Sequence, residues 1–75
     1  MKAAALTAAQ PHWVQPDGAP IACRDKLRTL DENWIEVRTV LQDAFEDALL
    51  IGVDEQKLRT ALMTLVQALQ SPFSP

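Results

Sequence analysis

Two side chains in this sequence are of types that take part in chemistry by themselves, Cys23 and His12. Arg24 and Lys26 follow the cysteine at the expected start of a helix, and positive charge there lowers a thiol pKa and favours a nucleophilic thiolate. The same cysteine also continues a series of apolar positions, and we favour that structural interpretation, a small buried side chain. His12 is the only histidine, so it has no second imidazole with which to share a metal ion.

Carboxylates form two further groups that resemble ligand sets. Glu32 and Glu36 lie one helical turn apart, and Asp43, Glu46 and Asp47 cluster further along the chain. Dimetal sites in helical bundles combine inward carboxylates with Glu-x-x-His pairs. No histidine follows these residues, and they lie off the apolar positions. We therefore expect them to form a solvated face.

Composition narrows the function classes further. The chain has 75 residues, one cysteine, two glycines and a net charge of −3. One cysteine cannot form a disulfide framework, and two glycines are too few for a glycine-rich phosphate-binding loop. The excess of acidic residues disfavours binding to nucleic acid. The longest apolar run, residues 48–51, is far shorter than the ~20 residues of a membrane helix. We expect one small domain that is not an enzyme, with no cofactor, no metal, no membrane span and no small-molecule substrate.

Residues 21–51 contain neither glycine nor proline and carry an apolar heptad pattern. One set of heptad positions is Leu27, Trp34, Leu41 and Ala48, and the other is Cys23, Leu30, Val37, Ala44 and Ile51. Such a pattern over nearly four heptads is typical of a long helix with one apolar seam. Pro20 suits the first helical position, and Gly52 suits the C-terminal cap. We therefore predict one helix over about residues 21–51.

A second, shorter helix is predicted over about residues 55–70, with Asp54 as its N-cap. Its apolar residues fall on one stripe, made by Leu58, Ala61, Leu62, Leu65, Val66 and Leu69. The two-residue junction predicts an all-α protein in which residues 21–70 form an antiparallel helical hairpin. Residues 1–20, rich in alanine and proline, are expected to form an extended N-terminal arm, and residues 71–75 a C-terminal tail.

One alternative divides the long helix. Thr29 and Glu32 have the spacing of a capping box, in which a threonine N-cap is followed three residues later by glutamate. A new helix starting there would give three helices. The unbroken heptad pattern favours the single helix.

The predicted hairpin leaves part of its apolar surface uncovered. At 1.5 Å per residue the first helix is ~45 Å long and the second ~24 Å, so the second covers only half of the first. The seam over residues 23–37 must then be covered by the arm, through Leu6, Trp13 and Val14, or by another chain. Because a two-helix core is small for a folded domain, we expect a partner chain to complete a bundle.

Charge along the long helix indicates how a second copy would pack. Arg24, Lys26 and Arg28 lie at its start, and the Asp43–Asp47 acidic group lies near its end. Both groups oppose the helix dipole. Two antiparallel copies would bring basic and acidic ends together, which predicts an antiparallel homodimer.

The sequence therefore favours a small acidic protein–protein interaction module: an accessory subunit, an adapter, or a stoichiometric regulator or inhibitor of a larger protein. The expected partner-binding residues are Leu27, Leu30, Trp34 and Val37, with Trp13 as an additional anchor. A metal- or redox-handling accessory protein that uses Cys23 and His12 is the alternative, and a DNA-binding regulator is a second. The weakly apolar first ten residues do not resemble a signal peptide, and with the lone thiol this predicts a cytoplasmic protein.

Overall fold

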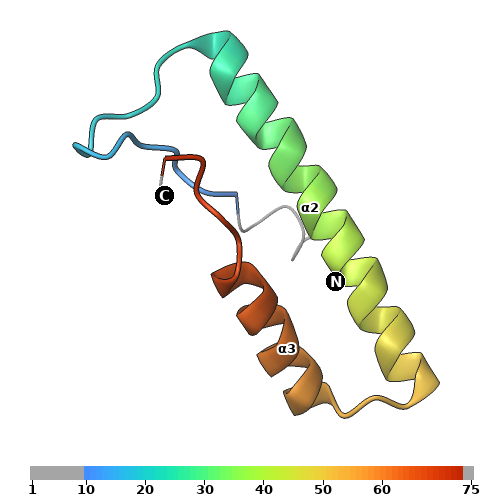
Figure 1. The fold of residues 1–75 in the computed structure, drawn as a ribbon. Coiled ribbons are helices and arrows are strands. Elements are labelled where there is room, and N and C mark those ends of the chain that lie inside the picture. Colours follow the sequence, from blue (N-terminus) through green and yellow to red (C-terminus); the bar gives the residue numbers. More distant parts are fainter. Residues whose placement is uncertain (1–9, 74–75) are drawn as a thin grey trace. The chain divides into compact units, whose positions relative to one another are not determined.

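The computed structural model describes residues 10–73 and is all-α over that range. Helix α2 spans Arg24–Ile51 and helix α3 spans Glu55–Gln67, as Figure 1 shows. The last turns of α2, the short connection and α3 form the predicted helical hairpin. The chain divides into two units, unit 1 (Met1–Gln42) and unit 2 (Asp43–Pro75).

Helix α2 begins three residues later than predicted. The backbone carbonyl of Cys23 accepts the first helical hydrogen bond, from the Leu27 N–H at 3.0 Å. Pro20, which was predicted to open the helix, instead forms an isolated antiparallel bridge with Val14. A turn at Gly18, with φ of +90°, allows the chain to reverse between these two residues. The start predicted from Pro20 is therefore wrong, because pairing across this loop competes with helix initiation.

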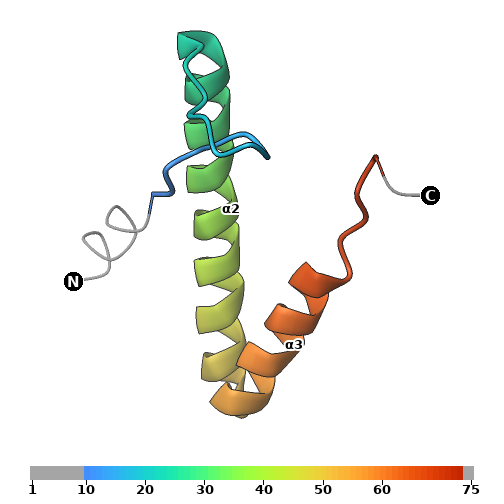
Figure 2. The ribbon, with the colours of Figure 1, turned by 90° about the vertical axis from the view of Figure 1, so that its left-hand side faces the viewer.

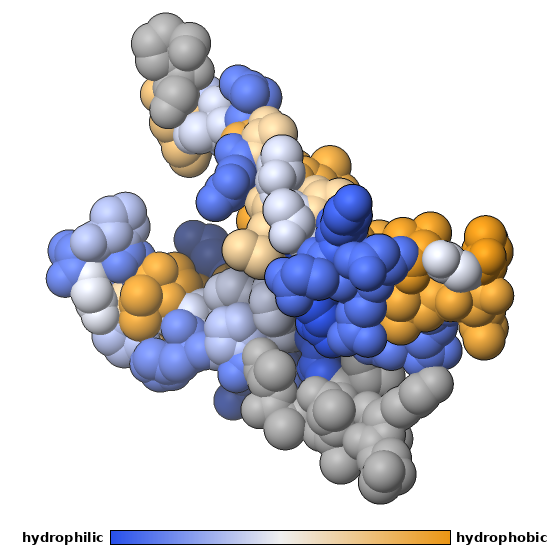
Figure 3. Space-filling view, turned by 90° about the horizontal axis from the view of Figure 1, so that it is seen from below, coloured by the Kyte–Doolittle hydropathy of each residue, from blue (hydrophilic) through white to orange (hydrophobic). Residues whose placement is uncertain are grey.

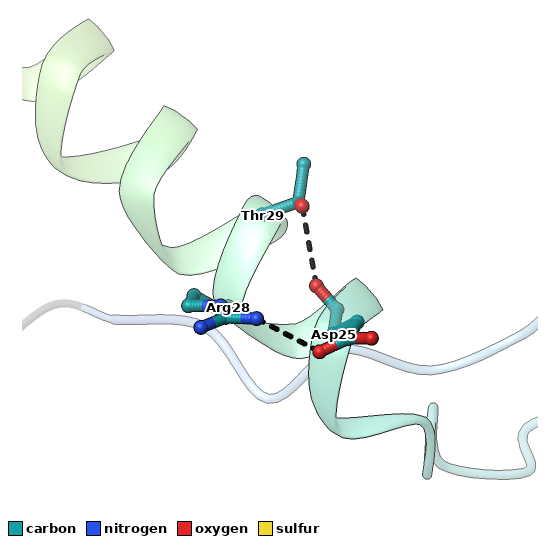
Figure 4. Close-up of polar contacts among 3 residues, drawn as sticks. All are labelled: Asp25, Arg28 and Thr29. Carbon is teal, nitrogen blue, oxygen red and sulfur yellow. Dashed lines mark hydrogen bonds and ion pairs between the residues drawn. The ribbon is translucent and has the colours of Figure 1, made fainter.

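The first turns of α2 are continuous through Thr29, so the alternative of a second helix start is wrong. The Thr29 hydroxyl donates to the Asp25 carbonyl at 3.1 Å, a bond from one helical turn to the previous one. The Arg28 guanidinium pairs with the Asp25 carboxylate at 2.8 Å, as seen in Figure 4. Both contacts require an uninterrupted helix, which confirms the single-helix prediction.

The connection between the helices has the predicted caps. Gly52 has φ of +113°, and its N–H donates to the Leu49 carbonyl at 3.1 Å, while the Val53 N–H donates to the Ala48 carbonyl at 3.0 Å. This pair of bonds is a Schellman motif, which ends a helix at glycine. The Asp54 carboxylate then accepts from the Lys57 N–H at 2.9 Å and caps α3.

Helix α3 ends three residues earlier than the predicted residue 70. The Leu69 N–H donates to the carbonyl three residues back, at Val66, and so forms a tighter turn than an α-helix. The apolar stripe continues beyond the helix end, which explains why the sequence pattern predicted a longer helix.

No residue of the described range 10–73 is fully buried. Large apolar side chains are instead half-buried or exposed, and this part of the chain has no closed hydrophobic core. A chain of this composition normally buries apolar surface to offset the entropy of folding. The absence of a core within residues 10–73 thus indicates that a partner is needed. Neither α2 nor α3 is long and apolar enough to cross a membrane.

Candidate partner-binding surfaces

The N-terminal arm, described from Gln10 onward, folds back onto α2 within unit 1. The Trp13 indole N–H donates to the Asp31 carboxylate at 2.8 Å, and its ring meets the Trp34 ring edge to face, with centroids 5.9 Å apart and planes at 80°. Figure 2 shows this part of the chain crossing the first half of α2. Two residues that were both predicted as partner anchors therefore contact each other in the same chain.

Asp31 is the polar centre of this contact. The hydrogen bonds donated by Trp13 and by the Gln10 side chain stabilise its charged form and lower the pKa of its carboxyl group. A bond from an indole N–H to a carboxylate is stronger than a bond between neutral groups. Asp31 therefore holds the arm more strongly when its carboxyl group is ionised than when it is protonated. No local sequence signal marks Asp31 for this role, because its partner Trp13 lies 18 positions away.

The other predicted anchors are covered to different extents. Leu27 is half-buried and lines an open cleft of about 400 Å³ together with Trp13 and Ile21. Leu30 is half-buried and lines a second cleft of about 390 Å³, again with Ile21. Val37 is 48% exposed. The arm thus covers the first part of the seam and leaves its end open, and a role of these residues in binding another protein stays a prediction.

Other parts of the predicted arm contribute less. Val14 is 50% exposed and pairs with Pro20 rather than covering the seam. Leu6, the third residue expected there, lies outside the described residues. Among the described arm residues, Trp13 and Gln10 therefore make side-chain contacts with α2, both of them at Asp31, and Trp13 also contacts Trp34.

Trp34 carries a buried polar atom without a partner. Its indole Nε1 is shielded from solvent and makes no hydrogen bond. Burying such a donor without an acceptor costs about 1–3 kcal/mol. The Trp13 N–H is therefore hydrogen-bonded to Asp31, whereas the Trp34 N–H is shielded from water and has no acceptor.

Cys23 is exposed, so the predicted small buried side chain is wrong. It is the residue before the first turn of α2, where the backbone N–H groups of Lys26 and Asp25 donate to its sulfur and lower the pKa of the thiol. His12 is also exposed and lines the cleft beside Trp13. Among residues 10–73 no three histidine, cysteine or acidic side chains gather as a metal site requires.

In unit 2 a side-chain contact between the two helices lies near the connection. The Arg59 guanidinium lies 4.7 Å from the centre of the Phe45 ring and also pairs with Glu55 at 3.1 Å. Leu58 and Leu62 are half-buried on the same helix. Figure 3, viewed from the end where α2 passes into α3, shows hydrophobic side chains open to solvent in this region.

The second half of α3 and the turn that follows it carry an apolar surface that is largely exposed, with Leu62 half-buried at one end. We call it the α3 patch, and it consists of Leu62, Met63, Leu65, Val66 and Leu69. Leu65 and Val66 are 56% and 55% exposed, and Leu69 is 72% exposed. A groove of about 330 Å³ is lined by Leu62, Met63, Val66 and Gln67. All of these residues except Met63 belong to the apolar stripe that was predicted to pack inside the hairpin, and their exposure was not predicted.

A signal for this surface was present in the sequence. Residues 60–73 contain no charged side chain, although 23% of the whole chain is charged. A helix that packs only along one stripe normally carries charges on its other faces.

Comparison with known proteins provides no further assignment. No family model matches the chain, and neither a curated protein nor a solved structure is significantly similar to it.

Proposed function

We propose that this protein is a small interaction module that acts by binding another polypeptide chain through the apolar faces of its helices. The observation that supports this most directly is the absence of any fully buried residue between positions 10 and 73. Large apolar residues that stay exposed in both units mark surfaces for association rather than for catalysis. An accessory subunit, an adapter or a stoichiometric regulator of a larger protein fits this description.

Self-association in antiparallel orientation is part of the proposal. Arg24 and Lys26 lie at the start of α2, and Asp43 and Asp47 lie near its end. Antiparallel copies place each basic start beside an acidic end, whereas parallel copies place like charges together. Exposed ion pairs contribute about 0–1 kcal/mol each, so they select the orientation and do not supply the stability.

The two alternatives have less support. A metal- or redox-handling protein would bring Cys23 and His12 together with further ligands, and a DNA-binding regulator would need several free basic residues on one face. Of the basic residues, Arg28 pairs with Asp25 and Arg59 pairs with Glu55. Cytoplasmic residence stays a prediction from the sequence.

The test combines the mass in solution with thermal unfolding. Light scattering after size exclusion, with reductant present, is expected to give twice the 8.3 kDa of one chain at micromolar concentration. The midpoint of unfolding should then rise with protein concentration, because dissociation and unfolding are coupled. A monomer that unfolds cooperatively at the same temperature at all concentrations would contradict a need for any partner.

A further inference from the structure

We propose that residues 10–21, called the cover below, are a displaceable occupant of the first part of the α2 seam. The cover holds the place of an extended segment of another protein that carries a tryptophan. This inference rests on the proposed function, because it names the kind of chain that the module binds and what controls access to the binding surface. The cover and the surface beneath it both lie within unit 1.

The surface beneath the cover is one face of α2, made by Leu27, Leu30, Asp31 and Trp34. These residues are spaced three or four apart, so they lie on one side of the helix, and between residues 24 and 37 they are the half-buried ones. The carboxylate at the middle of this otherwise apolar face favours an occupant with an N–H donor, because burying a carboxylate without a hydrogen bond is costly. The face therefore selects its occupant by hydrogen bonding as well as by apolar contact.

The cover supplies these donors from two side chains. The Trp13 indole donates to the Asp31 carboxylate at 2.8 Å, and the Gln10 side chain donates to the same carboxylate. Pro11 and Trp13 are half-buried, whereas His12 between them is exposed, which is the alternation of an extended chain. A segment of the chain itself thus shows which kind of occupant fits this face, an extended segment with a tryptophan.

The backbone of the cover is bonded to itself. The Ile21 N–H donates to the Trp13 carbonyl at 3.0 Å, and the Gln15 N–H donates to the Ala19 carbonyl at 2.7 Å. Within the described part of the chain, no backbone hydrogen bond joins residues 10–21 to α2. The cover can therefore leave the face as a preformed loop, and only side-chain contacts break when it does.

The cover also leaves one group of the face unsatisfied. The Trp34 N–H is shielded from water and has no acceptor, although the Trp13 ring lies against the Trp34 ring with centroids 5.9 Å apart. A segment that repeats the contacts of Trp13 and adds a carbonyl oxygen for this N–H gains a hydrogen bond that the cover does not make. The cover of a second copy would repeat the same unsatisfied group, so the face favours a segment of a different protein.

Binding of a peptide to the full chain tests this proposal. In ¹⁵N-labelled Trp13→Ala, Trp34 is the only tryptophan, so its indole ¹H–¹⁵N signal reports the face alone. The probe is an unlabelled peptide with the sequence of residues 10–21. We expect this peptide to shift the Trp34 signal in Trp13→Ala. It should bind the wild type about tenfold more weakly, because the wild-type face is already covered.

A matched pair of peptides tests the role of Asp31. The same peptide with Trp13→Phe keeps an aromatic ring and loses the N–H donor, so it should bind the Trp13→Ala protein about fivefold more weakly. When the protein also carries Asp31→Ala, the two peptides should bind with equal affinity. A fivefold preference that persists in this double variant would overturn the assignment of Asp31 as the acceptor. Circular dichroism of each variant reports whether α2 remains formed.

Two results would overturn the proposal as a whole. The first is a helical Trp13→Ala whose Trp34 signal does not respond to the peptide. The second is equal affinity of the peptide for Trp13→Ala and for the wild type, which would show that it binds elsewhere. If Trp13→Ala loses its helix, the labelled wild type replaces it. Excess peptide should then move the Trp13 indole signal to its position in the labelled peptide alone, and an unmoved signal would contradict displacement.

The mass in solution separates this proposal from the proposed function. A wild-type dimer that becomes a monomer in Trp13→Ala would identify the cover of a second copy as the occupant, and would overturn a different protein in that place. We expect the mass of Trp13→Ala to equal that of the wild type. Failure of the peptide to bind would leave the self-association of the proposed function untouched.

Discussion

The two units treat similar apolar helix surfaces in different ways. In unit 1 the seam of α2 is partly covered by the chain itself, through the contact of Trp13 with Trp34 and the hydrogen bond to Asp31. In unit 2 the stripe of α3 is covered only near the connection and is exposed from Leu65 onward. The difference teaches that one aromatic residue of an extended segment can cover part of an apolar seam, whereas the stripe of α3 has no such residue and stays exposed beyond Leu62.

Removing the main contact of the arm should abolish this difference. In Trp13→Ala both the ring contact with Trp34 and the hydrogen bond to Asp31 are lost. We therefore expect the free energy of opening of unit 1 to fall by about 2 kcal/mol. Hydrogen exchange of the α2 amides over residues 24–42 measures this effect. Trp13→Phe keeps an aromatic ring but removes the N–H donor, so its loss should be about 1 kcal/mol. Unchanged exchange in Trp13→Ala would mean that the arm does not stabilise α2.

The two glycines provide a matched comparison between the units. Gly18 in unit 1 has φ of +90° and Gly52 in unit 2 has φ of +113°, and an added Cβ at either position meets no atom within 4 Å. Substitution by alanine therefore costs backbone strain alone, about 1 kcal/mol at each site. We expect Gly18→Ala to increase amide hydrogen exchange in unit 1. Gly52→Ala should increase amide hydrogen exchange around the connection in unit 2. Equal effects of either substitution on both units would show that the units unfold together.

Acidification should weaken the attachment of the arm to α2, because the Asp31 carboxylate loses its charge. The pKa of Asp31 is lowered in the folded state by its bonds from Trp13 and Gln10, so this stabilisation is fully present above the unfolded pKa. It is lost as the pH falls through the folded pKa, when the carboxylate takes up a proton. The indole ¹H–¹⁵N signal of Trp13 is expected to shift in this range. In Asp31→Asn, which keeps an acceptor that does not titrate, the signal should stay constant over the same range.

The smallest expected effect is a change in the pH dependence of alkylation at Cys23. Its thiol pKa is lowered by the N–H groups of Lys26 and Asp25 at the start of α2, so the folded protein holds more thiolate at neutral pH than the unfolded chain. Alkylation by iodoacetamide should therefore reach half of its maximal rate at a lower pH in the folded protein than in urea. Identical pH profiles would show that the helix start does not act on the thiol.

The elements that could be predicted from the sequence are those set by neighbouring residues. The heptad pattern correctly predicted that α2 continues past Thr29 without a break. Gly52 and Asp54 act as the helix caps that their residue types and positions indicated. Local rules could not predict the start of α2, because Pro20 pairs with Val14 across a loop. For the seam over residues 23–37 the sequence left two covers open, the arm through Trp13 or another chain, because a contact between residues far apart in the chain, such as Trp13 and Trp34, has no local signal.

The exposure of α3 could not be predicted for a different reason. Periodicity identifies an apolar stripe but does not tell what covers it, so Leu58 and Leu69 look alike in the sequence. Only the structure separates the covered part of the stripe from the exposed part.

The pairing of Trp13 with Trp34 has a consequence for how this protein can be observed. The chain has no tyrosine, and these two residues are its only tryptophans, so its near-ultraviolet absorption and intrinsic fluorescence originate in unit 1. Unit 2, with phenylalanine as its only aromatic residue type, is optically silent at those wavelengths. Light emitted by the native protein therefore reports the closing and opening of the arm, while any event confined to α3 passes unseen unless it reaches the indoles.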